Sequence, residues 1–215
     1  MSLFAGVTLK VEIEYEEFPA FALNSNTKPD ELQRGYLQLL QAPKDANFTF
    51  HVGDEKILAH KNILSVRSTY FANMFESGMR ENWTNKVRVA DVRPEVFRAL
   101  LKYLYAEVPP EHFPMAQRLI IVADKYGLTD LKSICERILF VNLSSRHLED
   151  VGNVDAVVDA LLIGERLGCN DLLLRAWVVL KENAGKLSGE NRVKLIQTDP
   201  ELVLKMLAWG LKTTE

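Results

Sequence analysis

The sequence predicts an α+β fold, a small β-sheet flanked by helices, followed by an all-helical extension. Two observations lead to this prediction. The β-rich runs all lie in the first ninety residues of the 215-residue chain. After the Pro109-Pro110 pair, every apolar pattern has helical spacing. The length allows one large domain or two small ones, each with a core of its own.

Charge and composition exclude several classes of protein. The net charge is −3, from 26 Lys and Arg against 29 Asp and Glu, so we expect no nucleic-acid partner. The chain contains no apolar run of about 18–20 residues, so we expect no membrane partner either. The start, Met1–Val11, does not resemble a signal peptide. Cys135 and Cys169 lie inside helical patterns, which indicates buried thiols and an intracellular location, nuclear or cytoplasmic.

The N-terminal segment contains one isolated strand pattern. Val7–Tyr15 alternates apolar and polar residues, and residues 18–29, which contain two prolines, form a linker. A single strand cannot bury one face alone, so it needs a sheet from elsewhere. Asp30 is then placed to cap a helix whose apolar residues recur at helical spacing. These residues are Leu32, Tyr36, Leu39 and Leu40.

Residues 47–105 carry the patterns of the sheet and of the helices around it. Two β-rich runs, residues 47–52 and 56–60, flank Gly53-Asp54 and predict a hairpin. Apolar residues from Ile63 to Phe75 predict one helix. Residues 86–89 predict a third strand, and Pro94 opens a helix through Tyr105.

Five further helices are expected in the extension: 113–126, 129–140, 154–167, 170–182 and 201–211. Residues 123–131 have an echo in residues 164–172, where a glycine closes one helix and Asp-Leu opens the next. The echo has two interpretations, shared turn chemistry or a true repeat of a helix pair.

Motifs for catalysis are missing from the sequence. There is no phosphate-binding glycine loop, nucleophile elbow or metal-binding pair of cysteines. His60 lies where a predicted strand meets a helix, and a hydrogen-bonded structural role is expected for it. We therefore expect no enzyme activity and no catalytic, cofactor-binding or metal-binding residues.

The stretch Ala59-His60-Lys61 followed by Ile63-Leu64 and Arg67-Ser68 resembles the BTB/POZ domain family. The likeness continues in order through residues 91–97, 101–105, 119–128 and 131–136. It implies a BTB/POZ fold over residues 30–141. Residues 142–215 resemble the helical BACK region of speckle-type POZ proteins, and residues 1–29 correspond to the end of the MATH domain that precedes BTB in that group.

This resemblance implies a homodimeric, non-catalytic substrate adaptor of a cullin-3 RING ubiquitin ligase. The adaptor would bind the cullin through the BTB and BACK-like helices, and would bind substrate through a domain that is not present here. The alternative is a BTB oligomerisation module of a transcription regulator or scaffold without a ligase role. The Val7–Tyr15 strand is expected to be the last strand of a truncated MATH sandwich; the other interpretation is that the strand has another use.

The resemblance also implies site residues. The dimer interface would be formed by Leu32, Tyr36, Leu39, Leu40 and Ile63; the other interpretation is that these residues only cover the domain's own core.

Cullin binding is implied for the segment after the Met74-Phe75 helix end, where the hydrophobic–x–Glu motif of the family falls on Met79-Arg80-Glu81. Met74 belongs to the same candidate site. Tyr105 is a further candidate, with core packing as its other interpretation. The BACK-like helices could provide a second self-association patch, which would assemble dimers into larger oligomers.

Overall fold

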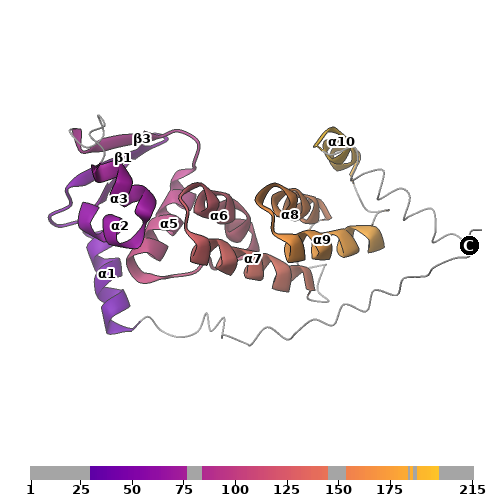
Figure 1. Ribbon diagram of the computed structural model, residues 1–215, viewed down its shortest axis with the longest axis horizontal. Helices are drawn as coiled ribbons and strands as arrows, with labels where there is room; N and C mark the ends of the chain where they lie inside the picture. Colours follow the sequence, from indigo (N-terminus) through magenta and orange to yellow (C-terminus); the bar gives the residue numbers. More distant parts are fainter. Residues whose placement is uncertain (1–29, 77–83, 145–153, 184, 186–187, 199–215) are drawn as a thin grey trace, which may run out of the picture.

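A three-stranded sheet with helices around it forms the N-terminal part of the chain (Figure 1). The structure is a computed structural model, which describes residues 30–76, 84–144, 154–183, 185 and 188–198. The elements of this part are α1 (Glu31–Gln41), β1 (Phe48–Val52), β2 (Glu55–Ala59), α2 (Lys61–Arg67), α3 (Thr69–Glu76), β3 (Lys86–Val89) and α5 (Pro94–Ala106). The predicted isolated strand Val7–Tyr15 lies outside the described residues.

The sheet has the strand order β2-β1-β3, so β1 is its central strand. β1 and β2 form the predicted antiparallel hairpin, with Gly53 at φ 57° in the turn, and β3 pairs with β1 in parallel. Alternate residues of β1 (Phe48, Phe50 and Val52) are buried at 0–1% exposure. Phenylalanines of the helices pack on them, with ring centroids 4.8 Å apart for Phe50 and Phe97. The aromatic core therefore lies between the sheet and the helices.

The predicted single helix from Ile63 to Phe75 is wrong in one respect, because Ser68 divides it into α2 and α3. Ser68 has extended backbone angles, φ −150° and ψ 120°, and its side chain is buried. Its Oγ accepts a hydrogen bond from the backbone N–H of Phe71 at 3.5 Å. Serine favours this capping role over a helix interior, which explains the break.

The second part of the chain is helical, as predicted. It consists of α6 (Phe113–Lys125), α7 (Thr129–Ser144), α8 (Val154–Leu167), α9 (Asn170–Glu182) and α10 (Gly189–Thr198). α7 is longer than expected. α10 was not predicted; Leu195 is its one buried hydrophobic residue among the described side chains, so these show no repeating pattern of buried apolar residues. The predicted helix 201–211 lies outside the described residues. A single buried cluster runs from β1 to α9, so the extension shares one continuous core with the sheet.

The two echoing turns have the same backbone geometry. Gly127 and Gly168 adopt φ 65° and φ 69°, in the left-handed region that glycine enters without steric cost. The N–H after each glycine donates to the carbonyl five residues earlier, from Leu128 to Ala123 and from Cys169 to Gly164, at 2.8 Å in both turns. This is the Schellman pattern of a helix end, so the shared turn chemistry is confirmed.

α8 and α9 approach each other closely at Gly164. A Cβ atom added to Gly164 would lie 2.9 Å from the backbone nitrogen and 3.0 Å from the Cα of Leu173. These are backbone atoms of a packed helix, so they cannot move aside cheaply. Gly35 in α1 is different, because a Cβ atom added there would have no neighbour within 4 Å.

Gly164→Ala is expected to lower the free energy of unfolding by about 1–3 kcal/mol through overpacking between α8 and α9. The matched control, Gly35→Ala, also replaces a helical glycine and should instead stabilise α1 by up to about 1 kcal/mol, through helix propensity. Urea denaturation of both variants measures the two changes. Equal effects of the two substitutions would contradict close packing at Gly164.

Candidate interaction surface

A groove of about 510 Å³ opens between α1, α2 and the C-terminal end of α5. Its walls include Leu32 and Tyr36 from α1, Ile63 and Val66 from α2, and Leu104 from α5. Figure 1 shows α1 projecting beside α2 and α5. Leu32 is 69% and Val66 85% exposed, which is unusual for aliphatic side chains that lie together at one groove. The groove is therefore the best candidate for an interaction surface in the described part of the chain.

α1 is held at this position by polar contacts at its N-terminal end. Asp30 caps the helix: its Oδ1 accepts from the N–H of Gln33 at 2.7 Å, and the Gln33 side chain accepts from the N–H of Asp30 at 3.1 Å. Gln33 also donates through Nε2 to the carbonyl of Ala106 at 3.0 Å. The last carbonyls of a helix have no partner within it. Gln33 therefore joins the start of α1 to the end of α5.

An ion pair joins α2 to the residue after α5. Arg67 Nη2 lies 2.6 Å from Glu107 Oε1, and Glu107 adopts the left-handed φ of 53° that ends α5. Both side chains are at least one-third exposed, so the pair contributes little stability by itself. It does place opposite charges at one rim of the groove.

His60 and Tyr105 form a buried hydrogen-bonded junction below the groove. The Tyr105 hydroxyl lies 2.9 Å from both the backbone nitrogen and the ring Nδ1 of His60, and His60 Nε2 lies 2.8 Å from the Lys44 carbonyl. A carbonyl only accepts, so Nε2 carries the proton and Nδ1 accepts from the hydroxyl. The hydroxyl in turn accepts from the His60 N–H. Burial raises the pKa of Tyr105, so it stays protonated. The structural role predicted for His60 is confirmed.

The predicted dimer residues differ in their exposure and in whether they line the groove. Leu32 and Tyr36 are exposed at the groove. Leu40 and Ile63 pack against the core, although Ile63 also lines the groove. Leu39 is half-buried and does not line the groove. The interpretation that these residues cover the core therefore fits Leu40 best.

Val66 was not among the predicted interface residues. It lies three positions after Ile63, on the same side of α2, and it is the most exposed large hydrophobic side chain in the described part of the chain. The three-residue spacing from Ile63 was the sequence pattern that could have identified Val66 as an interface residue.

The predicted cullin-binding residues do not form one described site. Met74 is half-buried and packs against the core. Tyr105 is only 5% exposed, which favours its interpretation as a core residue. Met79 and Glu81 lie outside the described residues. Cullin binding by these four residues stays a prediction.

Both cysteines of the chain are free thiols buried in the described structure. Burial raises the pKa of Cys135 to about 12 and that of Cys169 to about 11, so both thiols are protonated and unreactive at neutral pH. Among the residues that the structure describes, no group of three His, Cys, Asp or Glu side chains could hold a metal ion. None of the described helices is long and apolar enough to cross a membrane.

Exposed apolar side chains beside a groove on an α+β domain are typical of a protein-interaction module. A model of the BTB/POZ domain family matches residues 36–143, half of the chain. The chain belongs to the BTB/POZ family. Domains of this family are protein-interaction modules that are generally non-catalytic and commonly self-associate as dimers.

One solved structure similar to this chain is the BTB domain of zebrafish PATZ1. The two sequences are 21% identical, and the TM-score is 0.44. The alignment covers 50% of this chain and 87% of that chain.

Tyr105→Phe is expected to lower the free energy of unfolding by about 1–3 kcal/mol, because it leaves the buried His60 N–H and Nδ1 without a partner. The control is Tyr70→Phe. Tyr70 is 42% exposed, so loss of its hydroxyl should change the stability by less than about 0.5 kcal/mol. Thermal or urea unfolding measures both. A neutral effect of Tyr105→Phe would show that the junction does not contribute to stability.

Proposed function

We propose that this chain is the homodimeric, intracellular adaptor part of a cullin-3 RING ubiquitin ligase. The observation that carries the self-association is the exposure of Leu32, Tyr36 and Val66 on one face of a BTB/POZ domain. The proposed dimer is isologous, so each copy contributes the same face and each contact occurs twice.

The proposed dimer contact is driven by apolar burial. Full burial of an aliphatic or aromatic side chain contributes about 1.5–3 kcal/mol. Three exposed side chains on each copy supply a central apolar cluster of the kind that dominates interfaces. The Arg67–Glu107 pair at the rim adds charge of both signs, which fits a self-complementary contact.

The proposed cullin contact rests on sequence position. α3 ends at Glu76, and the next segment contains Met79-Arg80-Glu81, the pattern by which the chain resembles cullin-binding BTB proteins. A methionine fits irregular apolar pockets, and Glu81 would order the segment around it. Substrate would be bound by a domain outside this chain, and α8 and α9 would extend the cullin surface.

The second candidate function is a BTB oligomerisation module in a transcription regulator or scaffold, without a ligase. The same apolar face supports it, because both functions need the dimer. They differ only in whether the dimer binds cullin-3.

Replacing Leu32 and Val66 together by Asp is expected to convert the dimer to a monomer that keeps its fold, because both side chains are exposed. Two carboxylates facing their symmetry mates would remove the apolar contact and add repulsion. Light scattering or analytical ultracentrifugation measures the mass, and circular dichroism checks the fold. Val141→Asp is the control, since Val141 is 46% exposed on α7 and does not line the groove. A double variant that remains dimeric would exclude this face.

Met79→Ala and Glu81→Lys are each expected to weaken binding of the cullin-3 N-terminal domain at least about tenfold, the usual cost of losing a central anchor. The dimer should be unchanged in both. Isothermal titration with wild type and variants measures the affinity. If wild type does not bind cullin-3, the ligase role is excluded and the oligomerisation module remains. If wild type binds and both variants bind equally well, the motif is not the contact.

A further inference from the structure

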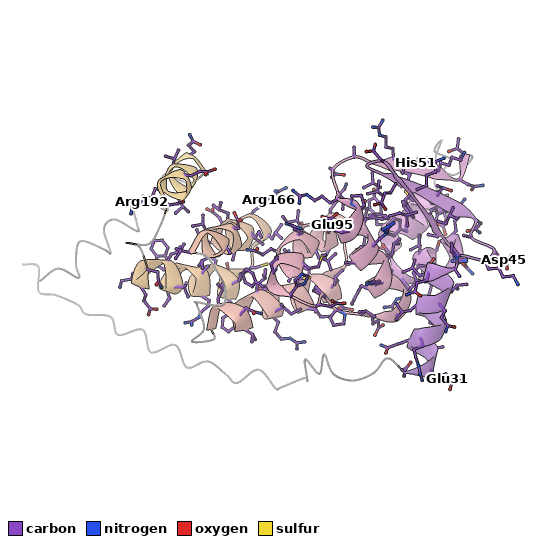
Figure 2. All side chains as sticks on the ribbon, turned by 180° about the vertical axis from the view of Figure 1, so that it is seen from behind. Glu31, Asp45, His51, Glu95, Arg166 and Arg192 are labelled. Atoms are coloured by element: carbon purple, nitrogen blue, oxygen red, sulfur yellow. The ribbon has the colours of Figure 1, made fainter. Side chains whose placement is uncertain are left out.

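β3 forms one edge of the sheet, and its outward side chains are both cationic. Lys86 and Arg88 are exposed on the face that also carries Thr49 and His51 of β1, which are their register partners (Figure 2 labels His51). Neither cation forms an ion pair with any residue that the structure describes. Two cations two residues apart therefore project from the same side of this edge.

The inward side of β3 is incompletely covered. Val89 is buried at 5% exposure, but Val87 is only half-buried. The opposite edge strand, β2, differs, because its inward Ile57 and Ala59 are 8% and 0% exposed. The outward side of β2 also differs, since it combines Lys56 with the apolar Leu58. Of the two edges, β3 is the one that would gain burial and charge neutralisation from an added strand.

The pattern needed by such a strand is specific. On the inward side it should present apolar side chains to Val87, and on the outward side it should present carboxylates to Lys86 and Arg88. Side chains alternate between the faces of a strand, so the carboxylates must recur at every second residue, about 6.7 Å apart. Cations at an edge discourage pairing with an ordinary strand. A strand with acidic residues at alternate positions turns that repulsion into attraction.

The chain itself contains this pattern. In residues 11–17, Val-Glu-Ile-Glu-Tyr-Glu-Glu, the apolar Val11, Ile13 and Tyr15 alternate with glutamates 12, 14 and 16. We propose that residues 11–17 add as a fourth strand to the outer edge of β3 in the same copy of the chain, with Glu12 and Glu14 beside Lys86 and Arg88. This gives the isolated strand pattern a sheet within this chain, where the MATH resemblance would place it in another domain.

The connection to the folded domain is long enough for this contact. Residues 18–29 separate the segment from the helix cap at Asp30, and twelve extended residues span up to about 40 Å. A domain of about 100 residues has a radius of gyration of about 13 Å, so the edge of the sheet is within reach. A tether of this length gives an effective concentration of about millimolar, which favours the segment of the same copy over that of another.

Zero-length cross-linking of the full chain with a carbodiimide tests the contact, because this reagent joins a lysine amine to a carboxylate only when they touch. Mass spectrometry should find Lys86 linked to Glu12, Glu14 or Glu16. Links to Lys56 should be at least about tenfold rarer, because Lys56 lies on the opposite edge strand, about 10 Å away or more. An absence of links to Lys86, or equal linking to Lys56, would overturn the proposal.

Charge exchange distinguishes a specific contact from a chance encounter. The added strand should protect the backbone amides of residues 86–89 from hydrogen exchange. Replacing both cations, Lys86→Glu with Arg88→Glu, should reduce this protection by at least about tenfold. Adding Glu12→Lys and Glu14→Lys to this variant should restore the hydrogen-exchange protection. The carbodiimide should then join the amines introduced by Glu12→Lys and Glu14→Lys to the carboxylate introduced by Lys86→Glu. Failure of this rescue in a folded protein would overturn the proposal.

Two further measurements remain informative if the sheet variants fold poorly. Ile13→Asp changes only the segment, and it should abolish the Lys86 links, while Phe21→Asp in the linker should leave them intact. In an equimolar mixture of ¹⁵N-labelled and unlabelled chains, each cross-link should join two peptides that are both labelled or both unlabelled. Mixed-isotope links would show that a second copy supplies the strand, which would overturn the assignment to the same copy. None of these outcomes depends on dimerisation through the α1–α2 groove or on cullin binding.

Discussion

The buried hydroxyl of Tyr105 holds together the elements on which the groove depends. It satisfies the backbone N–H and the ring Nδ1 of His60, and the same ring reaches the carbonyl of Lys44. One junction thus fixes the end of β2, the segment after α1 and the last turn of α5. Apolar burial drives folding but is non-directional. A satisfied hydrogen-bond network specifies one arrangement. α2 begins directly after His60, so the position of the groove wall follows from this junction.

The buried cluster joins the helical extension to the sheet domain, and polar contacts join the helices of the extension to one another. Lys132 in α7 donates to Asp124 at 2.7 Å and to the carbonyl of Leu167 at 2.9 Å, so one side chain bridges the ends of α6 and α8. Arg175 in α9 donates to the carbonyl of Leu143 at 3.1 Å. Because the buried cluster continues from β1 into α9, a partner that contacts both parts meets elements that share one core.

Local chemistry made part of this fold predictable from the sequence. The Gly53 hairpin, the Asp30 cap and the Gly127 and Gly168 turns each depend on a few neighbouring residues. The parallel pairing of β3 with β1 depends on how the helices between them pack, and no local pattern encodes it. The candidate site shows the same division. Periodicity identifies an apolar helix face but not what covers it, so the sequence did not distinguish Leu32, which is exposed, from Leu40, which packs against the core.

The groove and the sheet edge differ in the physics of the contact that each can make. The α1–α2 groove combines exposed aliphatic side chains with one charge pair, a composition suited to a lasting contact between like copies. The β3 edge presents hydrogen-bonding backbone beside Lys86 and Arg88, in a chain whose net charge is −3. Another copy's β3 would bring like charges together, which opposes edge-to-edge aggregation. An acidic strand is attracted to this edge instead. The same two cations therefore oppose pairing with another copy's β3 and favour pairing with an acidic strand.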